Sequence, residues 1–556
     1  MTEVIGIDLG TTNSALAYSS GERVEVFPIP QLVNPGEERP EPLLPSFLFL
    51  DDPPIVGVLA QKKGLENAGR LVASAKSWLS HSGVDRTAAI LPPNAPEGVA
   101  KVSPVEASRR YLQHLREAWN KSYKNFDDCQ VLVTVPASFD AVARDLTLKA
   151  ADEAGYKNVI LLEEPQAAFY AWIERHPDWR TRVGVGDLIL VVDIGGGTTD
   201  FTLIAVRERE GELALERIAV GDHILLGGDN IDLALARHVA AGIAQKLDMM
   251  QFHALWQQCR AAKERLLAAD HQEKDAPVTV LGRGTGVVGG TIKTKVKRAD
   301  VERIVLDGFL PPVSLDAIPE RRRAGLAELG LPYASDAAIT RHLAHFLNRQ
   351  GATPSHVLFN GGVLRAGLIR DRILEVLNSW LPRPVTALVG EDLMHAVARG
   401  AAYYGLARQG KGVRIRGGVP RSYYVGIETA MPAVPGFPAP LKALTVAPFG
   451  MEEGTGHKFP NRVFALTVGE PAQFRFFQSN SRKDDAPGSL IEDVGEDFEE
   501  LAPIEVFLPG NAGESVPVTL EALVTETGVL ELWCVARDGR RWKLEFNVRA
   551  DARAMA

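Results

Sequence analysis

The chain has 556 residues, of which 46% are hydrophobic and 24% charged, and its formal net charge is −9. This length exceeds what one compact core holds, so about three or four domains or subdomains are expected. The negative charge argues against a general nucleic-acid binder, which would need a basic face. Three isolated cysteines, Cys129, Cys259 and Cys534, argue against a disulfide framework or a zinc site.

No signal peptide is expected, because the first residues lack a charged segment followed by an apolar run. No membrane helix is expected either, because no run of about 18 uncharged apolar residues occurs. We therefore expect a cytoplasmic protein that has neither a membrane nor nucleic acid as its partner.

The first part of the chain alternates short apolar strands with amphipathic helices, a pattern that predicts an α/β layered domain. The second of the long helices ends at Gly155, and glycine is the usual residue just after a helix. The expected elements are a strand at 4–9, β-like pieces at 28–58, a helix at 105–125, a strand at 130–135, a helix at 140–155, a strand at 158–162 and a helix after Pro165.

A second α/β half is expected from residue 186. Asp229 is expected to cap a helix in which apolar residues recur every four positions from Ile231 to Leu247. The expected elements are two strands within 188–206, this helix, a helix at 252–269, β-like residues at 277–297, a helix at 336–350, a strand at 356–360 and a helix at 365–380.

The composition changes near residue 410, and the glycine-rich residues 409–420 are expected to form a linker. Residues 421–556 lose helical periodicity, and Gly, Pro, Asn and Asp clusters separate short alternating segments. This pattern predicts an all-β domain of the sandwich type. The expected strands are 421–427, 463–468, 473–478, 504–508, 516–523 and 529–535.

Two similar segments, residues 5–14 (IGIDLGTTNS) and 192–200 (VDIGGGTTD), are the most informative feature of the chain. Each has an apolar strand, an aspartate, a glycine turn with hydroxyls and then a second strand. Glycine lets backbone N–H groups approach a phosphate closely, and the threonine hydroxyls add donors. Two copies predict a duplicated fold with a nucleotide between its halves. The alternative is two ordinary glycine-rich hairpins in a large sheet.

The aspartates of these segments predict Mg²⁺. Asp8, Asp193 and Asp200 would repel phosphate oxygens unless a cation lay between them. The segments are not a Walker A loop, because no G-x-x-x-x-G-K-[ST] occurs in the chain.

Six spaced motifs occur in order: IGIDLGTTNS, TVPASF, EEPQAA, DIGGGTTD, LGGDNID and NGGVLR. Together they resemble the seventy-kilodalton heat-shock chaperone (DnaK-type) family of the actin-like ATPase superfamily. The resemblance implies an α/β actin-like ATPase domain with two lobes and four subdomains over 1–408. A linker at 409–420 and an all-β, substrate-binding domain at 421–556 would follow, without a helical lid.

The resemblance also implies roles at the phosphate end of the site. Asp8 would hold Mg²⁺ through water, and Asp200 would be a second outer-shell ligand. Asp193 and Thr198 would orient water and contact the γ-phosphate. Lys76 would meet the γ-phosphate and the attacking water, and Glu164 would lie near the metal and that water. The turn residues that would line the phosphates are Gly10, Thr11, Thr12, Asn13, Gly195, Gly196, Gly197 and Thr198.

At the nucleoside end, the resemblance implies that Arg365 stacks on adenine, which suits a planar guanidinium. Lys263 would lie near the ribose. The glycine turns expected on this side are Gly227-Gly228 and Gly361-Gly362. Pro136 and Arg144 match an interlobe relay. Without the resemblance, Lys76 and Arg144 read as surface residues and Glu164 as an acid favoured at a helix N-terminus.

Two departures from the family pattern limit these expectations. The adenine-side helix usually carries glutamate, lysine, arginine and serine, whereas this chain has Arg260, Lys263, Glu264 and Leu267. Purine contacts should therefore differ, and adenine preference is less secure than phosphate binding. The linker residues 413–416 (VRIR) are basic, whereas the family linker is acidic and leucine-rich. Without a lid, we expect fast or weak client binding, or a different partner.

The resemblance implies a chaperone that binds and slowly hydrolyses MgATP to modulate polypeptide binding by the β domain. A J-domain co-chaperone and a nucleotide exchange factor would be its protein partners. Two alternatives remain open at this point: a nucleotide-sensing scaffold that barely hydrolyses, and a small-molecule kinase of the same superfamily, which would need an aspartate base.

Overall fold

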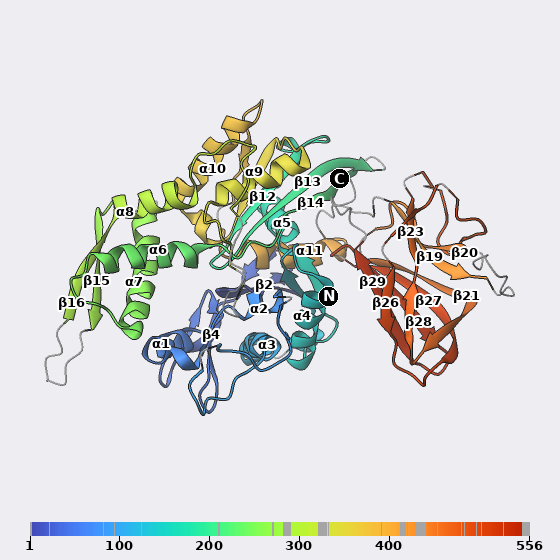
Figure 1. Cartoon of the computed structure of the whole chain (residues 1–556), viewed down its shortest axis with the longest axis horizontal. Coiled ribbons are helices and arrows are strands. Elements are labelled where there is room, and N and C mark those ends of the chain that lie inside the picture. Colours follow the sequence, from blue (N-terminus) through green and yellow to red (C-terminus); the bar gives the residue numbers. More distant parts are fainter. Residues whose placement is uncertain are drawn as a thin grey trace. The chain divides into compact units, whose positions relative to one another are not determined.

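The computed structural model describes residues 3–547 except 22, 82, 94, 124, 210–211, 269–271, 282–290, 321–330, 332, 391, 412–418, 420, 430–440, 453, 480, 483, 496, 502 and 526. The chain divides into two compact units, of which the first is Met1–Ala205 with Val220–Arg414 and the second is Val206–Ala219 with Ile415–Ala556 (Figure 1). The basic linker residues 413–416 lie outside the described residues. The domain boundaries at 408 and 420 stay predictions.

The first unit contains the whole of one large sheet and most of a second, and the two sheets share one topology. In the first sheet, β1 lies between its antiparallel partner β2 and its parallel partner β10, and β11 continues the sheet in parallel. Its order is β11-β10-β1-β2-β3, and β6 (Leu44–Pro45) pairs with β2 off this path. The other strands are β1 (Val4–Asp8), β2 (Asn13–Ser20), β3 (Arg23–Val26), β10 (Gln130–Val135) and β11 (Ile160–Glu163).

The second sheet repeats this arrangement, as the two similar segments predicted. β12 pairs antiparallel with β13 and parallel with β17, which in turn pairs parallel with β18. Its order is β14-β13-β12-β17-β18, and its strands are β12 (Leu188–Ile194), β13 (Thr199–Arg209), β14 (Glu212–Val220), β17 (His356–Asn360) and β18 (Thr386–Leu388). Each central strand therefore reaches its glycine turn with an aspartate at its carboxyl end, Asp8 in β1 and Asp193 in β12.

Helices pack on both faces of the first sheet. Ile5 and Ile7 of β1 are fully buried in one cluster with Leu112 of α3 (Pro104–Ser122) and Ala150 of α4 (Ala141–Glu153). The opposite face contacts α11 (Ala396–Arg408), which also crosses α5 (Glu164–Arg175). A Cβ at Gly400 would lie 1.7 Å from the carbonyl oxygen of Ala167, so glycine permits the close crossing of α5 and α11.

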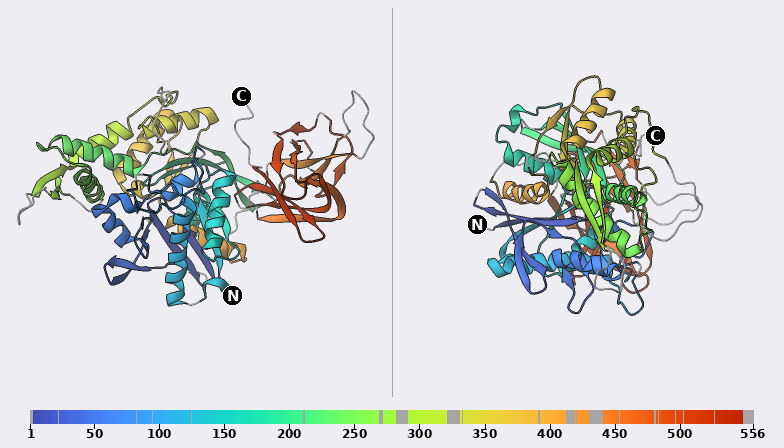
Figure 2. Two further views of the ribbon diagram at one scale, coloured as in Figure 1. Left: turned by 60° about the horizontal axis from the view of Figure 1, so that its bottom comes forward. Right: turned by 90° about the vertical axis from the view of Figure 1, so that its left-hand side faces the viewer.

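A smaller region of the first unit holds α7 against the β15–β16 hairpin, green in Figures 1 and 2. Its elements are α6 (Gly228–Ala241), α7 (Met249–Leu267), β15 (Asp275–Leu281), β16 (Thr291–Lys297), α8 (Arg298–Arg303) and the π-helical η4 (Ile304–Phe309). The remaining elements of the unit are β4 (Ile29–Asn34), β5 (Glu37–Glu41), β7 (Leu48–Phe49), β8 (Ile55–Val56), α1 (Val58–Glu66), η1 (Ala68–Arg70), β9 (Leu71–Val72), α2 (Ala75–Leu79), η2 (Phe126–Asp128), η3 (Trp179–Thr181), α9 (Ile339–Gln350), η5 (Gly362–Arg365) and α10 (Gly367–Trp380).

The described elements from Ser422 to Asn547 are all strands, as expected for a β-rich C-terminal region. β27 alternates buried and exposed side chains, the pattern of a half-buried strand. Residues of β19, β20, β27 and β28 share one buried cluster, so two sheets enclose a common core. The strands are β19 (Ser422–Glu428), β20 (Leu441–Ala447), β21 (Thr455–Val468), β22 (Pro471–Phe474), β23 (Phe476–Ser479), β24 (Leu490–Ile491), β25 (Glu499–Glu500), β26 (Ile504–Phe507), β27 (Glu514–Val524), β28 (Val529–Ala536) and β29 (Arg541–Asn547).

Three sequence predictions were wrong in detail. The helix whose apolar residues were expected to extend to Leu247 ends at Ala241. Asp229 does not cap α6, because Gly227 holds that position and the Asp229 N–H donates to the Gly196 carbonyl at 2.7 Å. The single strand expected at 473–478 is two strands, because β22 pairs with β26 whereas β23 pairs with β19. Among the described residues, every helix is too short or too polar to span a membrane.

Candidate functional site

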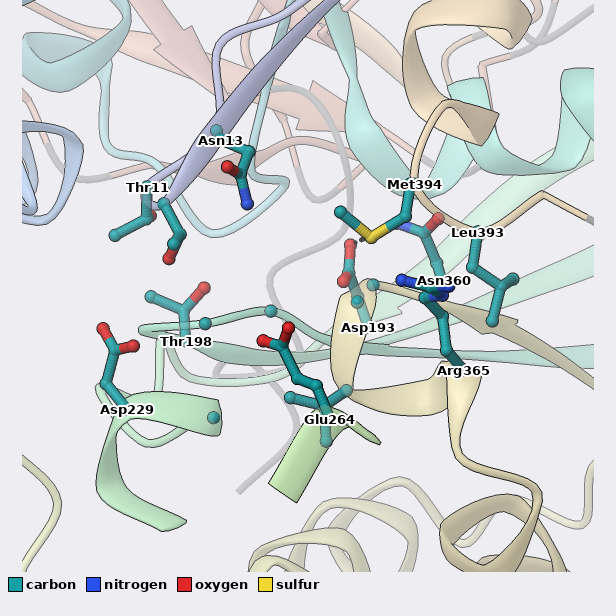
Figure 3. Close-up of a pocket in the computed structure, with 18 of the residues that line it drawn as sticks. Thr11, Asn13, Asp193, Thr198, Asp229, Glu264, Asn360, Arg365, Leu393 and Met394 are labelled. Atoms are coloured by element: carbon teal, nitrogen blue, oxygen red, sulfur yellow. Dashed lines mark hydrogen bonds between the residues drawn. The ribbon is translucent and has the colours of Figure 1, made fainter. Parts of the chain in front are cut away.

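A cavity of about 700 Å³ in the first unit is lined by the turns of both large sheets (Figure 3). Most of the predicted site residues line it: Asp8, Gly10, Thr11, Thr12, Asn13, Lys76, Glu164, Asp193, Gly195, Gly196, Thr198, Gly228, Lys263, Gly361, Gly362 and Arg365. Three predicted residues are not part of the described lining, namely Gly197, Gly227 and Asp200. The roles given to all of these residues stay predictions.

The two glycine turns meet at close range. A Cβ at Gly196 would lie 2.0 Å from Thr12 Oγ1, so a larger residue would displace the opposing turn. Thr12 Oγ1 is buried and has no hydrogen-bond partner among the described residues. Buried hydroxyls normally have a partner, so this orphaned group in the cavity wall fits an oxygen-rich ligand.

Lys76 and Glu164 form a buried ion pair in the cavity wall. Lys76 Nζ lies 2.5 Å from Glu164 Oε1, and the two side chains are 9% and 13% exposed. Lys76 comes from α2, and Glu164 is the first residue of α5. Burial alone would lower the pKa of Lys76, but the negative charges of Glu164, Asp8 and Asp193 outweigh it and raise the pKa. The site therefore holds a fixed cation at neutral pH. The reading of Lys76 as a surface lysine was wrong.

The aspartates of the two turns are partly buried and carry raised pKa values. Burial, with the charge of Glu164, raises the pKa of Asp8 to about 7 although Lys76 opposes the shift. Burial and the same charge also raise the pKa of Asp193 well above its usual range. Asn360 Nδ2 donates to Asp193 Oδ2 at 2.7 Å, the dashed contact in Figure 3.

Sequence reasoning missed Asn360, although its position gave a signal. It is the last residue of β17, which lies parallel to β12, so its side chain reaches the same sheet edge as Asp193. Carboxyl ends of parallel strands are where open α/β sheets bind ligands.

The acidic side chains fit a metal held through water better than a protein cage. Among the described residues, no three His, Cys, Asp or Glu side chains are placed to ligate one ion directly. Asp8 and Asp193 are nonetheless ionisable groups whose charge is disfavoured by burial, and a nearby divalent cation would relieve that cost. Mg²⁺ keeps several waters and takes few carboxylates when phosphates share its shell, so this donor set fits it.

Asp200 makes its contacts with protein groups outside the cavity lining. Its Oδ1 accepts from Ser138 Oγ at 2.6 Å and lies 3.2 Å from His223 Nδ1. Burial would raise the pKa of Asp200, but the charge of His223 and hydrogen bonds from His223 and Ser138 lower it. Neither Ser138 nor His223 was expected at the site.

The opposite wall of the cavity comes from α7 and the segments around Arg365 (Figure 3). Lys263 Nζ lies 2.7 Å from Asp232 Oδ1, and burial raises the pKa of Asp232 to about 6 although Lys263 lowers it. Arg260 lies between two acids, 3.7 Å from Asp229 and 3.2 Å from Glu264. Other lining residues that the sequence did not assign to the site are Leu43, Gln61, Ile231, Ala268, Val363, Ala366, Ile369, Leu393, Met394 and Val397.

The predicted relay residue Arg144 is 6% exposed, so the reading of it as a helix-surface arginine was wrong. Its Nη2 lies 3.6 Å from Glu163 Oε1 and donates to the Ala137 carbonyl at 3.4 Å. Glu163 directly precedes Glu164, so the Arg144 and Lys76 ion pairs use adjacent residues of the chain. A relay role for Pro136 and Arg144 stays a prediction.

The sequence model of the Hsp70 protein family matches residues 4–310, which is more than half of the chain. The matched segment includes both glycine turns, Lys76, Glu164 and the α7 residues, and it ends before β17.

Proposed function

Because the chain belongs to the Hsp70 protein family, whose members are ATP-hydrolysing chaperones, we propose that it binds and slowly hydrolyses MgATP in this cavity. Hydrolysis would change the affinity of the β-rich C-terminal region for a polypeptide client. The observation that carries the proposal is the buried Lys76–Glu164 pair beside two touching glycine turns.

The residues at the phosphate end of the cavity would have different roles according to their positions. The backbone N–H groups and hydroxyls of the two turns, residues 10–13 and 195–198, would cradle the phosphates. The Lys76 cation would offset charge that develops on the γ-phosphoryl group. Glu164 would orient the attacking water and accept its proton.

Asp8 and Asp193 would hold Mg²⁺ through water. A bound Mg²⁺ would supply positive charge that offsets the charge of the phosphates. Asp200, with its carboxylate already engaged by Ser138, would contribute to that shell less than the other two. At the nucleoside end, Lys263 would reach the ribose, and the Arg365 guanidinium would lie over the base between the Gly227-Gly228 and Gly361-Gly362 turns.

The coupling of the two regions follows thermodynamic linkage. ATP can change client affinity only by as much as the client changes ATP affinity. We propose a nucleotide-binding domain over 1–408, a linker over 409–420 and a client-binding β domain over 421–556. A J-domain co-chaperone and a nucleotide exchange factor would act on it in the cytoplasm.

Phosphate release from MgATP by the purified chain tests the proposal. Lys76→Ala and Glu164→Ala should each lower turnover at least ~100-fold, the size typical for loss of a group that acts on the transition state. The matched control is the exposed pair of Lys149 and Glu153, which are 53% and 41% exposed on α4. Lys149→Ala and Glu153→Ala should leave turnover within about twofold.

Three outcomes would redirect the assignment. Turnover that survives both cavity substitutions would mean that Lys76 and Glu164 are not catalytic. Tight nucleotide binding without turnover would favour a nucleotide-sensing scaffold. Phosphate transfer to a sugar instead of water would favour a small-molecule kinase.

A further inference from the structure

Ser138, Asp200 and His223 form a hydrogen-bonded cluster that is not part of the described cavity lining. Ser138 Oγ lies 2.6 Å from Asp200 Oδ1 and 2.9 Å from His223 Nδ1, and His223 Nδ1 lies 3.2 Å from Asp200 Oδ1. The Asp200 and His223 side chains are only 12% and 15% exposed. Burying polar groups costs free energy unless they bond to one another, so a cluster of three in a mostly buried position suggests a specific role.

The three residues come from different parts of the first unit. Ser138 lies between β10 of the first sheet and the start of α4. Asp200 is the second residue of β13 in the second sheet, two positions after Thr198. His223 lies in the segment that connects β14 to α6. The cluster therefore joins the first sheet to the strand that follows the second glycine turn.

The His223 segment is itself fastened to that turn. The Thr199 N–H donates to the Ile224 carbonyl at 2.9 Å, and Thr199 Oγ1 donates to the Leu226 carbonyl at 2.7 Å. Two residues further on, the Gly228 N–H donates to the Gly195 carbonyl at 3.0 Å. A displacement of the glycine turn must therefore move the His223 segment as well.

The hydrogen-bond roles are fixed by chemistry. Asp200 can only accept, so the Ser138 hydroxyl donates to it, and the Nδ1–H of His223 is then shared between Ser138 Oγ and Asp200 Oδ1. The His223 ring meets the edge of Phe139, with centroids 6.0 Å apart. His223 Nε2 is buried with no partner among the described residues, so Nδ1 is the nitrogen that makes the polar contacts.

We propose that Ser138 and His223 are positioning residues for ATP hydrolysis, which hold Asp200, and through it Thr198, against the first sheet. This inference rests on the proposed function. Because Ser138 and His223 are outside the described cavity lining, they act on the placement of Asp200 and of the Thr198 turn during the reaction and not on nucleotide binding. The same contacts carry movement of the turn to the segment between β10 and α4.

Kinetics of the full chain with matched substitutions test the proposal. Ser138→Ala and His223→Leu should each lower kcat by about tenfold, the size expected for a charge-assisted hydrogen bond used in the transition state, with the Kd of ATP within ~3-fold. Ser138→Thr keeps the hydroxyl, and His223→Asn keeps a donor near the Nδ1 position in a side chain that branches at Cγ as leucine does. Both should keep kcat within ~3-fold. The double substitution Ser138→Ala/His223→Leu should be no slower than the single ones, because each already opens the cluster.

Hydrogen exchange supplies a readout that does not need turnover. ATP should change amide exchange over residues 136–144 in the wild-type chain and in Ser138→Thr, but not in Ser138→Ala. Equal kcat in His223→Leu and the wild type, or equal loss in His223→Asn and His223→Leu, would overturn the positioning role. If the wild type binds ATP without turnover, the proposed ATPase function is wrong, and hydrogen exchange alone tests whether the cluster transmits movement of the glycine turn. If ATP does not bind, both proposals are wrong.

Discussion

Lys263 Nζ lies 2.7 Å from Asp232 Oδ1, yet the pKa of Asp232 is raised to about 6, because the carboxylate is only 2% exposed and burial disfavours its charge. A carboxyl group whose folded pKa exceeds its unfolded value of 3.8 binds a proton in the native state that the unfolded chain releases. Its contribution to stability is complete below about pH 4 and is lost as the pH rises through about 6.

We therefore expect the Asp232→Asn chain to lose less stability than the wild type between pH 4 and 6. The free energy of unfolding of the wild type should fall relative to the variant by about 1.4 kcal/mol per pH unit in that window. Urea denaturation at half-unit pH steps measures the difference. Asp51→Asn is the control, because the hydrogen bond from Lys63 lowers the pKa of Asp51 and places its effect below pH 4. Parallel profiles of wild type and Asp232→Asn would contradict the expectation.

Gly361→Ala should destabilise the chain and weaken nucleotide binding together. Gly361 has φ +93°, and a Cβ there would lie 2.3 Å from the Ile194 carbonyl oxygen at the end of β12. Strain at positive φ and the clash with backbone should together cost roughly 2–4 kcal/mol. Gly36→Ala provides the control, because Gly36 has φ +75° and open space around it. That variant should therefore show the backbone strain without a steric clash. Denaturation midpoints and ATP titration of both variants check this, and equal effects would refute the role of the contact.

The repeated part of the fold was predictable because its signals are local. An apolar strand, an aspartate and a glycine turn recur at Asp8 and Asp193, and each copy forms the central hairpin of a sheet. Lys76 and Glu164 could be assigned by resemblance to a family. Their burial and their contact across 88 residues of sequence could not be read from the pattern.

What the sequence missed depends on long-range placement. Ser138 and His223 are 85 residues apart and show no spacing signal, because only the packing of two sheets brings them together. Asp229 was assigned as a helix cap from its residue type. In the structure the Gly195 and Gly196 carbonyls accept the first N–H groups of α6, so tertiary contacts replaced the side-chain cap.

Glu164→Gln should be markedly less stable without nucleotide and should recover when MgATP binds. The substitution leaves the Lys76 charge without its closest counter-charge at 9% exposure, which costs about 3 kcal/mol for a buried pair. Phosphate oxygens bound beside Lys76 would supply negative charge and reduce the difference in stability between the wild type and Glu164→Gln. Thermal unfolding of both chains with and without MgATP measures this difference. Glu153→Gln, in an exposed pair, should change stability by less than about 0.5 kcal/mol. A stability difference between wild type and Glu164→Gln that MgATP does not change would mean that the phosphates do not bind beside Lys76.

The chain should discriminate weakly between ATP and GTP. The α7 side chains that line the cavity include Glu264 and Leu267, and the Arg260 guanidinium is held between Asp229 and Glu264. Of the two arginines in the described lining, Arg365 is therefore the one expected to stack on the purine, and stacking of this kind does not depend on which purine is bound. We expect ATP and GTP Kd values within about tenfold of each other, and Arg365→Ala should weaken both equally.

Glu264→Arg offers the sharpest test of this wall. It would add a second guanidinium facing the cavity and release Arg260 from Glu264, so affinity for both purine nucleotides should rise by about threefold to thirtyfold. Glu153→Arg, on α4 and outside the described lining, is the charge-matched control and should leave both Kd values unchanged. Competition between ATP, GTP and CTP for a fluorescent nucleotide measures the three affinities. Because CTP has a smaller ring to stack, its affinity should rise least. An equal gain in affinity for all three nucleotides would mean that Glu264→Arg acts through net charge near the phosphates and not through the base.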